Sequence, residues 1–191
     1  MKDPFATFYD GSDVPEQGTG DFPLIDPGEY QARLTSWSAY QKEENKIVHW
    51  IDFQIVGGKF DEKSKRYFHT IKTDDKDSRD FFVRLLRDLG LIKDPEDRLE
   101  DNSLPFRVVY GPPQNNGHQD VLAVEVKNND GEPVQRNTLN RMATIVIEHE
   151  EDKREKSPNY GKMQDWIKYV NPPADPDSVE QAADTVDEVP F

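Results

Sequence analysis

The chain has 191 residues, no cysteine and a formal net charge of −14. This length fits one domain with tails or two very small domains, and the lack of cysteine excludes disulfides, cysteine–zinc sites and thiol chemistry. Residues 1–30 and 171–191 each carry a net charge of −6, which leaves −2 for residues 31–170, so the acidity does not argue against a nucleic-acid ligand in the middle.

The N-terminal region has no pattern of regular structure. Residues 1–23 mix Gly, Asp, Pro and Gln with scattered Phe, and we expect an irregular, disordered arm. No apolar run approaches the length of a membrane span, and the first residues do not resemble a signal peptide. We therefore expect a soluble intracellular protein without a membrane partner.

The first two regular segments form a predicted β-hairpin. Tyr30, Ala32 and Leu34 alternate with polar residues, which is the period of a half-buried strand. A second alternating segment covers residues 47–56, and the polar residues 41–45 between the two indicate a turn. The hairpin is expected to start a sheet.

A third strand is expected over residues 65–72, and the pattern then becomes helical. Apolar residues recur on one helical face at Phe81, Phe82, Leu85, Leu86 and Leu89. Asp77 or Ser78 can cap the start of this helix and Gly90 can end it, which predicts a helix over residues 78–90.

Further strands are expected after the helix. Their predicted ranges are residues 105–110, 121–126, 142–149 and 161–170. Three strands, one helix and then short strands indicate a mainly β fold resembling an OB-type barrel, closed or nearly closed, over residues 24–170. An SH3-like barrel and a β-sandwich are the alternatives.

Large aromatic side chains fall on the polar faces of the predicted strands. Trp37, Trp50 and Trp166 each alternate with polar or basic neighbours, and one face of the third strand carries Phe68. Single-stranded nucleic acid binds such surfaces, because bases stack on exposed rings for about 1–3 kcal/mol each while cations neutralise the phosphates. Alternatively, the arm or a homodimer partner covers the rings, or a one-residue bulge turns them inward.

Basic residues near these rings are expected to contact phosphates. The expected set is Arg33, Lys65, Arg66, Lys72, Lys162 and Lys168. A further basic run, Lys153, Arg154 and Lys156, is interrupted by acids and by itself is typical of a solvated mixed surface.

Nothing in the sequence indicates catalysis or a metal site. The four His residues are scattered, and His49 on an apolar strand face reads as a packed core residue. Asp74, Asp75 and Asp77 lack the Gly and Glu of a calcium loop and instead suit the approach to a helix N-terminus. We expect no enzyme activity, no metal and no cofactor.

The C-terminal residues 171–191 are predicted to be a disordered acidic tail. They contain six carboxylates and no Lys or Arg, and end Asp-Glu-Val-Pro-Phe. The terminal Phe can enter an apolar pocket of a partner while the acids meet its cations. The predicted partner-binding residues are Asp184, Asp187, Glu188, Val189, Pro190 and Phe191. The alternative is a charged end that serves solubility.

Four of these features together resemble a family of bacteriophage proteins thought to bind single-stranded DNA. They are Leu24-Ile25-Asp26-Pro27-Gly28-Glu29-Tyr30, the hairpin 30–56, the helix followed by Gly90-Leu91, and the loop and strand 157–170. The acidic tip is similar to that of bacterial single-stranded DNA-binding proteins.

The resemblance implies an OB-type barrel that coats single-stranded DNA in phage replication or recombination, without enzyme activity. It implies the cytoplasm of an infected bacterial host, and replication or recombination proteins as partners of the tail. The main rival is an acidic inhibitor that mimics DNA and blocks a host nucleic-acid enzyme. Such a mimic would carry acids across its folded surface, whereas this chain concentrates them at its ends.

Overall fold

The computed structural model describes most of the central part of the chain. The described residues are 24–94, 96, 97, 99, 103–127, 131–155 and 157–175. The predicted arm, 1–23, lies outside them, as do residues 176–191 with all six predicted partner-binding positions. Within the described residues no helix is long and apolar enough to cross a membrane.

The fold is mainly β with one helix, as predicted. Its elements are β1 (Gly28–Glu43), β2 (Lys46–Ile55), β3 (Ser64–Lys72), α1 (Lys76–Asp88), β4 (Phe106–Tyr110), β5 (Gln119–Lys127), β6 (Pro133–Asn137), β7 (Met142–Glu151) and β8 (Met163–Asn171). Only β6 was not expected, because its five residues are polar except for Val134 and begin with a proline.

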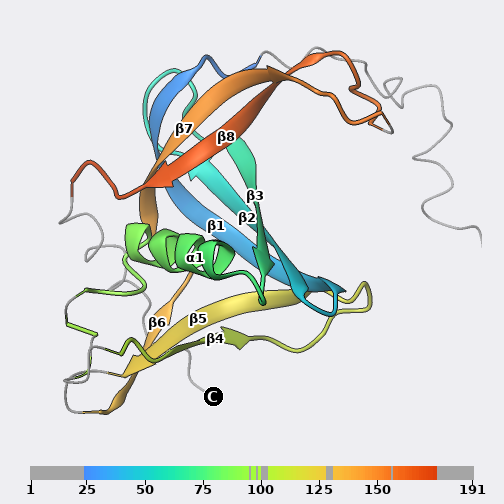
Figure 1. Ribbon diagram of the computed structural model, residues 1–191. Helices are drawn as coiled ribbons and strands as arrows, with labels where there is room; N and C mark the ends of the chain where they lie inside the picture. The colour runs from blue at the N-terminus through green and yellow to red at the C-terminus, as the bar shows by residue number, and fades with distance from the viewer. Residues whose placement is uncertain are drawn as a thin grey trace, which may run out of the picture.

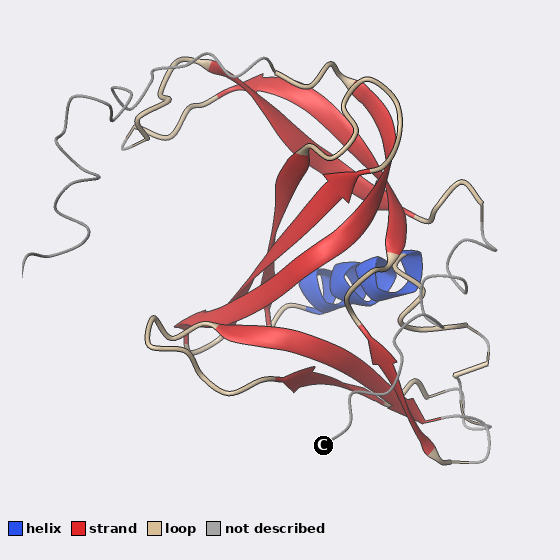
Figure 2. Cartoon of the chain, turned by 180° about the vertical axis from the view of Figure 1, so that it is seen from behind, coloured by secondary structure: helices blue, strands red, loops and turns tan. Residues whose placement is uncertain are grey.

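All eight strands belong to one antiparallel sheet that branches at β1 (Figure 1). On one side, β1 pairs with β2 along most of the length of β1. On its other side, the first half of β1 pairs with β7 and the second half pairs with β5. One branch therefore has the order β3-β2-β1-β7-β8, and the other is a small wing of β4, β5 and β6. Seen from behind in Figure 2, α1 lies between the two branches.

The sheet is not closed into a barrel, so of the two predicted forms, closed and nearly closed, the closed one is wrong. An ion pair from Lys65 on β3 to Asp165 on β8 joins the two edge strands, but no ladder connects them in the described part of the chain. At the far end of β3, the Ser78 hydroxyl accepts a hydrogen bond from Lys72 N at 2.9 Å. The start of α1 thus occupies the edge where a closing strand would pair.

Trp37 is buried, which corrects the prediction that it lies on the polar face. The β1–β2 register shifts between Leu34 and Ser36, so a bulge at Thr35 reverses the side-chain alternation. The indole Nε1 of Trp37 donates to His49 Nδ1 at 2.9 Å inside the core. Trp37 is therefore a core residue that is only 2% exposed.

A second register shift changes the face of β8. Val146 pairs with Tyr169 and Ile147 with Ile167, which leaves Lys168 as the extra residue. Ile167 is buried, whereas Met163 and Tyr169 are about half exposed, at 50% and 51%. The buried apolar side chains of β8 are therefore Ile167 and Val170.

Helix α1 fills the core between the branches. It begins two residues earlier than predicted, because the Asp75 side chain caps it by accepting from Asp77 N at 3.1 Å. Phe82, Leu85 and Leu86 are buried in the core shared by both branches. Gly90, in the left-handed conformation with φ of 64°, follows the helix end as expected.

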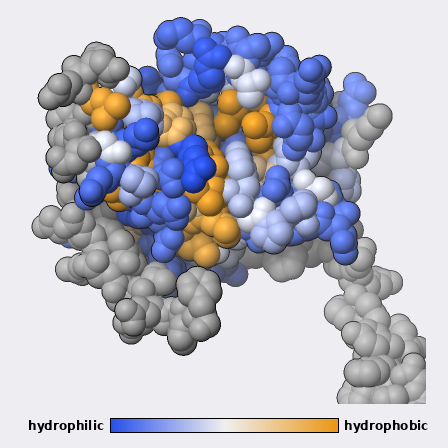
Figure 3. Space-filling view, turned by 90° about the horizontal axis from the view of Figure 1, so that it is seen from below, coloured by the Kyte–Doolittle hydropathy of each residue, from blue (hydrophilic) through white to orange (hydrophobic). Residues whose placement is uncertain are grey.

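The wing of β4, β5 and β6 buries one face and exposes apolar residues as well. Arg136 on β6 reaches inward and forms a bidentate pair with buried Asp97, at 2.5 and 2.8 Å. Seen from below, apolar side chains reach the surface between hydrophilic ones (Figure 3). Tyr110 and Leu122 are exposed members of the wing strands.

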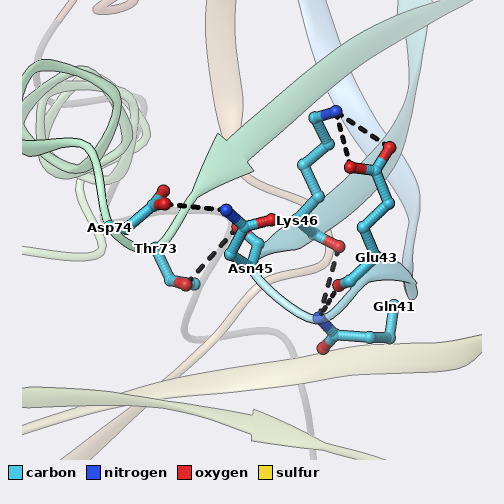
Figure 4. A network of polar contacts seen from close by, with 6 residues as sticks. All are labelled: Gln41, Glu43, Asn45, Lys46, Thr73 and Asp74. Atoms are coloured by element: carbon cyan, nitrogen blue, oxygen red, sulfur yellow. Dashed lines mark hydrogen bonds and ion pairs between the residues drawn. The ribbon is translucent and has the colours of Figure 1, made fainter.

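Polar contacts fasten the β1–β2 turn to the end of β3 (Figure 4). Asn45 donates from Nδ2 to Asp74 at 2.7 Å, and its carbonyl accepts from Thr73 N at 2.9 Å. Across the same turn, Lys46 pairs with Glu43 at 2.8 Å. These contacts fix how β2 and β3 present their outer side chains.

Candidate nucleic-acid interface

Three aromatic rings form a row on the outer side of β2, β3 and β8. Trp50 and Phe68 are cross-strand partners whose ring centroids lie 6.1 Å apart, and Trp166 lies 6.5 Å from Phe68. Phe68 is 47% exposed, and both indoles are half-buried. The structure therefore brings together three of the four predicted stacking residues, and Trp37 is the exception.

Two further rings extend the row at its Trp50 end. The ring of His118, in the loop before β5, lies 4.5 Å from Trp50 and stacks on Tyr40 at 4.6 Å. Tyr40 also meets Trp50 edge-on at 5.7 Å. Sequence reasoning missed both, because the bulge at Thr35 sets the face of Tyr40 and only the fold brings the loop to β2.

An arginine covers Trp50. The guanidinium carbon of Arg66 lies 5.0 Å from the indole centroid. Its Nε and Nη2 donate to the two carboxylate oxygens of Asp52 at 2.6 and 2.8 Å. The hydrogen bonds that Arg66 donates to Asp52 raise the pKa of Arg66, so this side chain stays charged.

A second arginine covers Trp166 in the same way. The guanidinium carbon of Arg154 lies 4.8 Å from that indole centroid, and its Nε and Nη2 donate to Asp152 at 2.8 and 2.6 Å. Asp152 also accepts from the Ser157 hydroxyl at 2.6 Å. Hydrogen bonds from Arg154 and then Ser157 hold the pKa of Asp152 far below its ordinary value, so the carboxylate stays ionised.

Phe68, Trp166 and the two arginines border a surface groove of about 810 Å³. It lies between β3, β8 and the β7–β8 loop, and its lining is Arg66, Phe68, Glu150, Glu151, Asp152, Lys153, Arg154, Trp166 and Ile167. Three basic and three acidic residues line it, so the groove combines aromatic stacking surfaces with mixed charge.

The other predicted phosphate contacts are not in this groove. Lys65 forms an ion pair with Asp165, and its side chain is 23% exposed. Lys168 forms an ion pair with Glu150 at 2.6 Å. Both lysine charges are thus neutralised by carboxylates of the fold. Arg33, Lys72 and Lys162 are exposed but do not line the groove. Their contact with DNA stays a prediction.

Arg154 is the main functional candidate absent from the predicted site. Its sequence signal was the basic run after β7, which its acidic neighbours obscured. Only the loop structure shows that Asp152 orients Arg154 onto Trp166. No group of three or more potential metal ligands occurs among the residues that the structure describes.

Comparison with known proteins gives no further assignment of this site. No family model matches the chain, and no curated protein matches it.

Proposed function

We propose that this protein binds single-stranded DNA without sequence preference, in the replication or recombination of a phage. The observation that carries the proposal is the continuous row of Trp50, Phe68 and Trp166 with an arginine over each indole. Stacking contributes about 1–3 kcal/mol per base and accepts every base, because each has a π-face. Such a surface suits binding that is independent of sequence.

The arrangement of strands supports this function. We assign an OB-type order to β3-β2-β1-β7-β8, with α1 following β3 and an opening between β3 and β8. OB folds are partly open barrels that bind oligonucleotides on the face of their second and third strands and with the loop between their last two. In that order, Trp50 and Phe68 occupy the face and Arg154 occupies the loop.

The acidic tail completes the proposal. Its carboxylates can compete with DNA for the cations of the domain, and its terminal Phe can engage replication or recombination proteins when DNA displaces it. The rival function, an acidic DNA mimic, needs no stacking surface and predicts no binding of single strands.

Phe68 provides the test. Phe68→Ala should weaken binding of oligo-dT by about 1–3 kcal/mol, roughly 5- to 150-fold, because the central ring is lost. The titration follows quenching of intrinsic Trp fluorescence, in which Trp50 and Trp166 respond while buried Trp37 stays constant. Phe81→Ala is the matched control, since Phe81 is 44% exposed on α1 and does not line the groove.

The wild-type signal itself decides between the two functions. Quenching by oligo-dT that reverses with added salt supports DNA binding. The proposal fails if no single strand changes the fluorescence, or if Phe81→Ala weakens binding as much as Phe68→Ala.

A further inference from the structure

The two arginines of the groove are held by the same contacts. In each case Nε donates to Oδ1 and Nη2 to Oδ2 of one aspartate, while the guanidinium lies over an indole. The two Trp–Arg–Asp units, Trp50–Arg66–Asp52 and Trp166–Arg154–Asp152, flank Phe68 on either side. The two units come from distant parts of the chain, so they share a geometry and not a local sequence motif.

This pairing leaves most of each guanidinium available. Arginine has five N–H donors, and the aspartate takes two, so within the described part of the chain both donors of Nη1 and one of Nη2 are left for a ligand. Arg66 and Arg154 keep 44% and 61% of their side chains exposed, whereas Asp152 is almost fully buried. The two hydrogen bonds to each carboxylate fix the plane of its arginine.

We infer that Asp52 and Asp152 are positioning residues that make Arg66 and Arg154 into two phosphate sites, one on each side of a base stacked on Phe68. The inference rests on the proposed function and names the ligand of each unit as a backbone phosphate of a single strand. The planar guanidinium fork matches the oxygens of phosphate, and a guanidinium already oriented loses less freedom on binding.

The inference makes a prediction opposite to that of simple electrostatics. Removing a negative charge from a DNA-binding surface ordinarily strengthens binding. Here Asp52→Asn and Asp152→Asn should each weaken oligo-dT binding about three- to tenfold, because the arginine loses its bidentate partner. Glu148→Gln is the control, since it removes an exposed carboxylate that lies opposite Trp166 across β7 and β8, does not line the groove and pairs with no arginine in the described residues. This variant should leave affinity equal or higher.

Two readouts separate positioning from a general structural role. The slope of log K against log salt should fall by about 0.7 in each Asn variant, the value for one lost phosphate contact on a single strand. In an Arg154→Gln background, Asp152→Asn should add little further loss, because the aspartate acts through that arginine. A dT oligomer with an uncharged methylphosphonate backbone should bind the wild type weakly.

The outcomes are distinguishable from those of the proposed function. If the full-length wild type binds no single strand, both proposals fall. If it binds but both Asn variants bind as tightly or more tightly, or the methylphosphonate oligomer binds as well as dT, the phosphate sites are refuted and DNA binding stands. Should Asp152→Asn fail to fold, Asp52, with 24% of its side chain exposed, decides the question.

Discussion

Two histidines form a buried pair beneath the aromatic row. His49 and His69 are cross-strand partners on the inner face of β2 and β3, behind Trp50 and Phe68, and they pack against Phe82. His49 Nδ1 accepts from Trp37, so the proton of the neutral ring is on Nε2, which has no partner among the described residues. Burial lowers the pKa of His49 to about 3 and that of His69 to about 4.

These histidines should make the protein sensitive to acid. Their pKa values are lower in the folded than in the unfolded state, so their contribution is complete above about pH 6.5 and is lost as the pH falls. Each should remove about 1.4 kcal/mol of stability per pH unit below 6.5, or about 2 kcal/mol at pH 5.

Urea unfolding at pH 7 and pH 5 measures this loss. His69→Phe, which places a similar ring beside Phe81 and Phe82, should roughly halve the difference between the two pH values. An unfolding free energy that is the same at both pH values would refute the assignment.

At the scale of the elements, one carboxylate joins three parts of the chain. Asp165 on β8 pairs with Lys65 on β3, and it accepts a hydrogen bond from Ile25 N at 2.8 Å in the segment before β1. Its side chain is only 7% exposed, so little solvent screens these contacts. Asp165 therefore links the two edge strands of the sheet, β3 and β8, beside the groove.

Asp165→Asn should therefore destabilise the fold by about 1–3 kcal/mol, since it leaves a partly buried lysine without its partner. Lys59→Gln is the comparison, because the Lys59–Asp26 pair is 73% and 61% exposed and should contribute little. Chemical denaturation of both variants checks the difference. Equal and small effects would show that Asp165 does not tie the edges.

At the scale of the whole molecule, the negative charge is concentrated at the two ends of the chain, and residues 31–170 are nearly neutral. Removing residues 176–191 deletes five of the fourteen excess negative charges and leaves every described residue in place. DNA affinity should rise at low salt, because the tail no longer competes for the cations, and the difference should shrink at high salt.

Gel-shift or fluorescence titration at two salt concentrations measures this effect. A full-length variant with the tail acids replaced by Asn and Gln should behave like the truncation. Binding that is unchanged or weaker in both variants would show that the tail does not compete with DNA.

Local patterns in the sequence predicted much of the fold and part of the site. Alternation placed Trp50 on the outer face of β2 and Phe68 on that of β3. Helical spacing placed Phe82, Leu85 and Leu86 inside, although Phe81, predicted on the same face, is 44% exposed. These predictions hold because each depends only on whether a regular strand or helix buries one face. Because these patterns are local, they do not predict which strands that are far apart in the chain lie next to each other in the fold.

Tertiary structure alone decided the remaining features. The bulge in β1 put Trp37 into the core, since a single extra residue reverses every later side chain and leaves no mark in the alternation. The meeting of β3 with β8, and the turn of the β7–β8 loop that sets Arg154 on Trp166, depend on contacts between distant residues. The sequence by itself thus determined which strands carry aromatic rings, whereas long-range packing decided which rings share one surface.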